Sequence, residues 1–186
     1  MAFVDLHRNR LILKAVLAGP PAVGKSERLW QLGHAGGVKR THEIGQTPLG
    51  PQRMASMDLE VEREGRSVEL EIYEWHGPEK ADVRGKGLAH GLDGLIYLAD
   101  ARPDRTVDTV RQLEFLISTF GKSRIQRIPS LLALGQMDAG LARLSALESQ
   151  LPTLTWGHRL EVLLEDEAGF VEAVLLLGEL MIARMV

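Results

Sequence analysis

A run of eight residues near the N-terminus has the residue types and the spacing that bind phosphate groups. Residues 19–26 read Gly-Pro-Pro-Ala-Val-Gly-Lys-Ser, which fits the pattern G-x-x-x-x-G-K-[ST] at every fixed position. In such a loop the backbone N–H groups surround the α- and β-phosphates, the Lys25 ammonium reaches the β- and γ-phosphates, and the Ser26 hydroxyl is a Mg²⁺ ligand. The predicted phosphate-binding residues are Gly19, Pro20, Pro21, Ala22, Val23, Gly24, Lys25 and Ser26.

The segments on either side of this loop are typical of the elements that must position it. An apolar run over residues 11–18 predicts a buried strand that ends directly before Gly19. Leu29 and Leu32 fall on one side of a helix predicted over residues 27–33, whose positive end would face the phosphates. This order favours a phosphate-binding loop over the alternative, a glycine turn followed by an incidental Lys-Ser pair.

The remaining chain changes repeatedly between strand and helix patterns. Alternating apolar residues over 57–62 and 68–73 predict a β-hairpin with one face in water. Apolar runs that predict interior strands occupy residues 94–99, 130–134 and 159–164. Helical spacing of apolar residues occurs over residues 107–117, 141–147 and 170–185, whereas residues 33–50 show no period and are predicted to be mainly loop. The alternation predicts an α/β protein with a mainly parallel six-stranded sheet, one antiparallel hairpin and helices on both faces.

Composition narrows the class of protein. The chain has 186 residues, of which 45% are hydrophobic and 25% charged, as in an ordinary single globular domain spanning residues 1–186. It has no cysteine, which excludes disulfides, thiolate metal sites and a thiol nucleophile. With 22 Lys and Arg against 25 Asp and Glu, no overall basic charge would attract nucleic acid or an anionic membrane. Since neither an apolar signal segment nor a membrane-spanning stretch is evident, we expect a cytoplasmic protein.

The sequence resembles the Ras-like small GTPases, and more closely the MglA-type bacterial GTPases of cell polarity and gliding motility. The stretches that carry this resemblance are residues 3–17, 19–26, 53–58, 91–100 and 128–138. The resemblance implies a three-layer P-loop NTPase fold that binds GTP or GDP with Mg²⁺. It also implies protein partners, such as a roadblock-domain activator and polarity or motility proteins.

Single residues of this family can be matched to positions of the chain. Arg53 matches the switch arginine that assists hydrolysis, whereas Met54 stands where the family has a threonine that senses the γ-phosphate. Asp58 matches an acidic residue near the metal, and it also fits an outward polar position on an alternating strand. Asp138 matches the acid that accepts the N–H groups of guanine, and it could equally cap the helix that follows.

The second switch departs from the family pattern. Residues 74–79 read Glu-Trp-His-Gly-Pro-Glu where MglA-type proteins have T-x-P-G-Q. Gly77 could supply an amide to a γ-phosphate, but Pro78 replaces the water-orienting glutamine and lacks an N–H group. His76 or Glu79 could orient water instead, although a lone His or Glu in such a segment is more often a solvated loop residue. We therefore expect slow or absent hydrolysis of GTP.

Two functional hypotheses remain open from the sequence. In the first, the chain is a guanine-nucleotide-binding switch with weak or absent turnover. In the second, it is a pseudo-GTPase that serves as a protein-interaction module without nucleotide cycling. The second hypothesis is motivated by the loss of the switch threonine and glutamine and of most of the base-recognition motif.

Two apolar features also have alternative interpretations. Trp75 is predicted to be a core residue, and would be a partner anchor if it were exposed. The apolar C-terminal residues 175–185 are predicted to pack on the sheet rather than to bind a membrane or a partner helix.

Overall fold

The computed structural model describes residues 3–34, 38–47, 50–77, 91–100, 102–135, 158–161 and 167–185. The strands are β1 (Phe3–Asp5), β2 (Arg10–Ala18), β3 (Val38–Thr47), β4 (Gly50–Arg63), β5 (Arg66–Glu74), β6 (Gly94–Asp100), β7 (Ser130–Gly135) and β8 (His158–Glu161). The helices are α1 (Lys25–His34), α3 (Thr106–Phe120), α4 (Lys122–Ile125) and α6 (Glu167–Ala183), with a 3₁₀ turn η1 (Pro103–Arg105) before α3.

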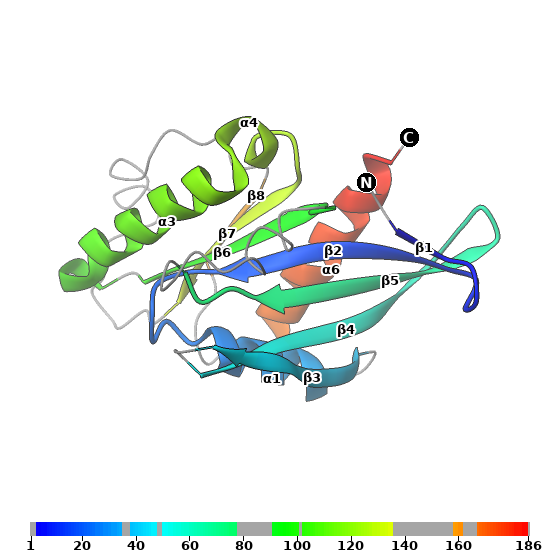
Figure 1. The fold of residues 1–186 in the computed structure, drawn as a ribbon, viewed down its shortest axis with the longest axis horizontal. Coiled ribbons are helices and arrows are strands. Elements are labelled where there is room, and N and C mark those ends of the chain that lie inside the picture. The colour runs from blue at the N-terminus through cyan, green and yellow to red at the C-terminus, as the bar shows by residue number, and fades with distance from the viewer. Residues whose placement is uncertain are drawn as a thin grey trace.

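All of these strands belong to one mixed sheet (Figure 1). Seven strands of the described chain follow the order β3-β4-β5-β2-β6-β7-β8, and β1 pairs with β2 outside this order. The pairs from β5 through β2, β6 and β7 to β8 are parallel, whereas β3-β4, β4-β5 and β1-β2 are antiparallel. The predicted α/β class, the mostly parallel sheet and the hairpin of β4 and β5 are confirmed. The prediction of six strands is wrong, because β1 and β3 also pair into the sheet.

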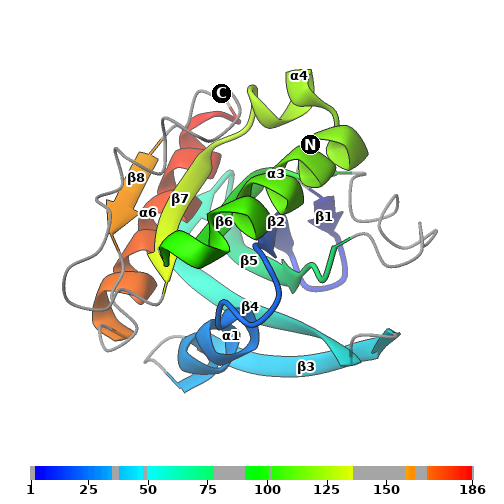
Figure 2. The same ribbon diagram turned by 90° about the vertical axis from the view of Figure 1, so that its left-hand side faces the viewer.

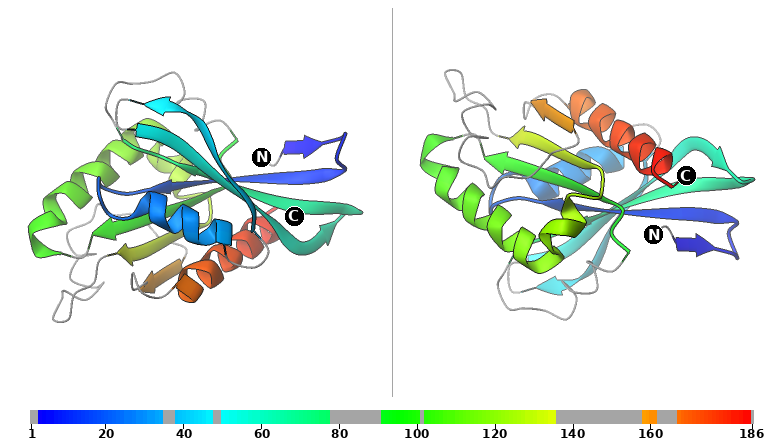
Figure 3. Two further views of the ribbon diagram at one scale, coloured as in Figure 1. Left: turned by 90° about the horizontal axis from the view of Figure 1, so that it is seen from below. Right: turned by 90° about the horizontal axis from the view of Figure 1, so that it is seen from above.

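Helices cover both faces of the sheet (Figure 2 and Figure 3). On β2, Leu13, Ala15 and Leu17 belong to the core shared with α1 and α6, whereas Val16 and Ala18 belong to the core shared with α3 and α4. Successive side chains of a strand point to opposite faces, so a nearly continuous apolar run is what a strand covered on both sides requires. This central strand carries the loop at residues 19–24 out of the sheet.

The prediction of a loop over most of residues 33–50 is wrong, because β3 occupies Val38–Thr47. β3 is held by its antiparallel ladder with β4, and the register of that ladder shifts between Val38 and Arg40 and again between Glu43 and Gly45. Each shift breaks the period-2 alternation that identifies a strand in a sequence. The pairing with β4 therefore forms a strand that the pattern of apolar residues does not reveal.

The prediction for Trp75 is confirmed. Trp75 is 5% exposed, and its ring stacks on Phe115 at a centroid distance of 5.8 Å and meets the Phe120 ring edge-on at 5.7 Å. The prediction that residues 175–185 pack on the sheet holds for Leu177, Met181 and Ile182, whereas Leu175 and Leu176 are 38% and 44% exposed. The C-terminal helix α6 packs its buried face, which includes Phe170 and Leu177, against the sheet. Among the described helices, none has both the length and the apolar character needed to cross a bilayer. The helix predicted over residues 141–147 lies outside the described residues.

Candidate functional site: the β2–α1 loop

The loop between β2 and α1 has a backbone shape that few residues permit. Gly19 has φ +154°, and a Cβ atom there would lie 2.2 Å from the carbonyl oxygen of Leu98. Gly24 has φ +91°, and Ala22 has φ +60°, a left-handed conformation that is unfavourable for a residue with a side chain. Backbone geometry therefore explains why Gly19 and Gly24 are glycines, whereas Ala22 adopts a strained backbone conformation within the loop.

The Lys25 side chain folds back over this loop. Lys25 is 6% exposed, and its Nζ donates hydrogen bonds to the carbonyl oxygens of Gly19 at 2.9 Å and Pro20 at 2.8 Å. Burial lowers the pKa of Lys25 to about 8, and the attraction of the Glu74 carboxylate opposes part of that shift. A buried ammonium whose hydrogen-bond partners are neutral carbonyls would gain from an anionic partner.

Ser26 and Glu74 bring two oxygen ligands together beside the lysine. The Ser26 hydroxyl donates to Glu74 Oε1 over 2.7 Å, and Glu74 is 1% exposed at the last position of β5. His76 Nε2 lies 3.7 Å from Glu74 Oε2. A hydroxyl and a carboxylate suit Mg²⁺, which prefers hard oxygen ligands and takes most of its other ligands from water and phosphate. In the described part of the chain, no cluster of three or more His, Cys, Asp or Glu occurs.

A pocket of about 450 Å³ opens over these groups. Its lining consists of Pro21, Ala22, Gly24, Lys25, Ser26, Glu27, Glu74 and His76. The loop, the first turn of α1 and the end of β5 thus share one cavity, which has the size of a small-molecule site. The beginning of α1 adds its unpaired N–H groups and the positive end of its dipole to this cavity.

Gly77 directly follows His76, which lines the pocket, but Gly77 itself lies against Gln112 of α3. Gly77 has φ +89°, and a Cβ there would lie 2.6 Å from Gln112 Oε1. That Gln112 oxygen is buried and accepts no hydrogen bond within the described residues. Pro78, Glu79 and Asp138, which carry the expectations for water orientation and guanine recognition, lie outside those residues.

The structure places Arg53 near the beginning of β4 and Asp58 in its middle. Met54 pairs with Tyr73, so Arg53 comes level with the carboxyl end of β5, and its Nη2 lies 3.8 Å from Glu43 Oε1. Asp58 pairs with Glu69, five residues before the end of β5. Arg53 is thus at the same edge of the sheet as the phosphate loop, whereas Asp58 is not brought together with Ser26.

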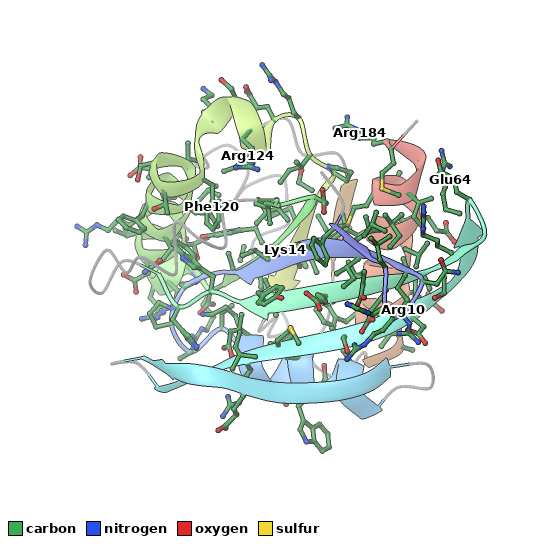
Figure 4. The ribbon with its side chains drawn as sticks, turned by 45° about the vertical axis from the view of Figure 1, so that its right-hand side comes forward. Arg10, Lys14, Glu64, Phe120, Arg124 and Arg184 are labelled. Atoms are coloured by element: carbon green, nitrogen blue, oxygen red, sulfur yellow. The ribbon has the colours of Figure 1, made fainter. Side chains whose placement is uncertain are left out.

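Asp58 has a structural partner instead. Arg10 Nη1 donates to Asp58 Oδ1 and to Glu69 Oε2, both over 3.0 Å. Arg10 begins β2, whereas the phosphate loop follows the end of that strand, and Figure 4 shows Arg10 on the side of the sheet where Glu64 marks the turn between β4 and β5. Asp58 therefore lies away from Ser26, and the carboxylate that the structure places against Ser26 is that of Glu74.

Sequence reasoning missed two residues at this loop, Glu74 and Arg105. Glu74 begins a Glu-x-x-Gly segment at the end of a strand, a weak form of the acidic D-x-x-G motif, and this signal could have identified it. Arg105 Nη2 donates to the carbonyl oxygen of Pro21 over 3.2 Å, across 84 positions of sequence. No motif marks Arg105, because its position depends on β6 lying beside β2.

Comparison with known proteins adds no relative. No protein-family model matches the chain, and no curated protein is similar to it at a significant level.

Proposed function

We propose that the chain is a guanine-nucleotide-binding switch or regulatory protein similar to MglA-type small GTPases, with weak or absent hydrolysis of GTP. The observation that carries the proposal is the buried Lys25 ammonium at the base of a pocket formed by the loop of residues 19–26. An ammonium in that position is costly unless an anion approaches it. A polyphosphate held by the loop amides and the α1 N-terminus supplies such an anion.

Mg²⁺ fits the same proposal. Ser26 and Glu74 would hold the ion, because their oxygens already lie 2.7 Å apart and both line the pocket. The ion would supply charge neutralisation on the phosphates. Glu74 accepts a hydrogen bond from the Ser26 hydroxyl, and Lys25 adds a positive charge to the same pocket.

The choice of guanine and the slow turnover rest on sequence. Asp138 is the residue proposed to accept the guanine N–H groups, and Pro78 replaces the glutamine that would orient water. Arg53 stands level with the carboxyl end of β5, which is compatible with a role in neutralising phosphate charge. With one candidate arginine and no water-orienting glutamine, hydrolysis would be slow.

The direct test is nucleotide binding with a charge-deleting variant. Purified protein is titrated with fluorescent analogues of GDP, GTP and ATP, with and without Mg²⁺, alongside Lys25→Ala and the control Lys122→Ala. Lys122 is exposed on α4, so its loss should leave affinity unchanged. We expect binding by the wild type and the control, and at least a tenfold loss in Lys25→Ala. Absence of binding to any analogue at micromolar concentration contradicts the proposal.

One observation favours the pseudo-GTPase as a second candidate. Without a ligand, Lys25 already has two carbonyl partners and Ser26 has Glu74, so the loop satisfies its own polar groups. A site of this kind could persist as a static scaffold for a protein partner. Thermal unfolding separates the candidates, because a nucleotide-binding protein gains stability with saturating Mg·GDP or Mg·GTP and a static module does not.

A further inference from the structure

Two consecutive prolines reduce the number of amide donors in the phosphate loop. Pro20 and Pro21 have no backbone N–H group, so they offer only carbonyl oxygens to their surroundings. Each of these oxygens accepts a hydrogen bond from a cation: Pro20 from Lys25 Nζ at 2.8 Å, and Pro21 from Arg105 Nη2 at 3.2 Å. Arg105 is thus a second cationic side chain in contact with the loop.

Two carboxylates hold the Arg105 guanidinium in place. Its Nη1 lies 2.8 Å from Asp108 Oδ2 in the first turn of α3. Its Nε lies 3.6 Å from Asp100 Oδ2, and Asp100 is fully buried at the end of β6. The Arg105 side chain is 28% exposed, and its Nε is buried and donates no hydrogen bond within the described residues. A planar guanidinium fixed in this way keeps its direction toward Pro21.

The residues that line the pocket include fewer positive than negative side chains, so a second cation beside the pocket would favour the binding of an anion. Among the lining residues, Lys25 is positive, whereas Glu27 and Glu74 are negative. To reach a phosphate, the Lys25 ammonium has to leave the carbonyl oxygens of Gly19 and Pro20. The contact of Arg105 with Pro21, which lines the pocket, does not involve the carbonyl oxygens of Gly19 and Pro20 that Lys25 occupies. The charge of Arg105 therefore remains at the rim when the ligand carries several negative charges.

We propose that Arg105 is a positioning residue of this site, which holds the Pro21 carbonyl and supplies a second positive charge for a polyphosphate ligand. The inference rests on the proposed phosphate-binding function. It adds that the site selects a ligand with two or more linked phosphates over a single phosphate group, because the added charge acts more strongly on the more highly charged ligand.

The test compares the binding of pyrophosphate and of inorganic phosphate, both in EDTA, to the full chain by calorimetry at several NaCl concentrations, because pyrophosphate without Mg²⁺ is the more highly charged of the two anions. The variants are Arg105→Ala, Arg105→Lys and the control Arg102→Ala. Arg102 also pairs with Asp100, at 2.7 Å, and its removal leaves the bond between Arg105 and Pro21 in place. We expect Arg105→Ala to weaken pyrophosphate binding about tenfold and to reduce its dependence on salt. Arg105→Lys should recover part of the affinity, and Arg102→Ala should change it less than about twofold.

The outcomes separate this inference from the function on which it rests. Wild-type protein that binds neither pyrophosphate nor nucleotide overturns both. Wild-type binding that Arg105→Ala leaves unchanged, or that Arg102→Ala weakens equally, overturns the role of Arg105 alone. If Arg105→Ala does not fold, Arg105→Gln replaces it, because glutamine keeps an N–H donor for Pro21 and removes the charge. An unchanged dependence on salt in that variant also overturns the inference.

Discussion

Raising the pH should remove the charge of Lys25 and weaken the binding of any polyphosphate. Burial holds the pKa of Lys25 near 8 in the ligand-free protein. Only the ammonium form attracts phosphate, so the protonated fraction of the free site sets the apparent affinity above that pH. About one molecule in ten is protonated at pH 9, which predicts that the dissociation constant rises about tenfold between pH 7 and pH 9.

The matched variant for this prediction is Lys25→Arg. A guanidinium stays charged throughout this range, so the affinity of the variant should follow only the titration of the ligand. Fluorescence anisotropy with a labelled nucleotide gives the dissociation constants of the wild type and of Lys25→Arg at each pH. The ratio of the wild-type constant to that of the variant, followed from pH 6.5 to pH 9.5, reports the titration of Lys25 alone. A ratio that does not change over this range would refute the reasoning, because the lysine would then keep an ordinary pKa.

The same pKa predicts an effect of opposite sign on the free protein. The pKa of Lys25 in the folded chain, about 8, lies below the ordinary value of 10.5, so folding disfavours the charged form. This destabilisation is fully present below pH 8 and disappears as the pH rises toward 10.5. The difference amounts to about 3 kcal/mol. The free energy of unfolding of the wild type should therefore rise relative to that of Lys25→Met between pH 8 and pH 10 in urea denaturation.

Three further predictions concern the shape and the metal site of the loop. Gly19→Ala should prevent stable folding, because its Cβ would lie 2.2 Å from the Leu98 carbonyl oxygen. The control is Gly65→Ala, where φ is +71° and no atom lies within 4 Å of the added Cβ, and thermal unfolding should show a loss of stability of only about 1 kcal/mol. Ala22→Gly should raise stability by about 1 kcal/mol, since it relieves a left-handed φ of +60°, and a lower melting temperature would show that Ala22 is unstrained. Glu74→Gln should abolish most of the gain in nucleotide affinity that Mg²⁺ gives while leaving binding in EDTA nearly unchanged, and an undiminished effect of Mg²⁺ would exclude Glu74 as a ligand.

The interior of the fold was predictable because its strands are covered on both faces. The apolar runs at β2, β6 and β7 identify them without knowledge of their partners. β3 was not predictable in this way, because its ten residues are held by the ladder with β4 and the ladder shifts register twice. A strand of this kind is defined by a neighbour that lies outside any local window of sequence.

The same distinction applies to the site. The Lys25 ammonium and the Ser26 hydroxyl belong to a contiguous motif, so eight residues of sequence suffice to predict that they act together. Glu74 and Arg105 reach the loop only because β5 and β6 are the two neighbours of β2. Their contribution follows from strand order, which the sequence pattern does not specify.

Strand register decides which acidic residue could share the proposed Mg²⁺ with Ser26. β5 runs parallel to β2, and Glu74 pairs with Leu17, one residue before the end of the strand that leads into the phosphate loop. Asp58 pairs with Glu69, near the beginning of that parallel pair, where Arg10 already binds both carboxylates. The five residue steps from Glu69 to Glu74 correspond to roughly 16 Å along a strand. That distance is far beyond the reach of a Mg²⁺ coordination shell, so if Ser26 binds the proposed Mg²⁺, an acidic residue that shares the ion has to come from the carboxyl end of β5.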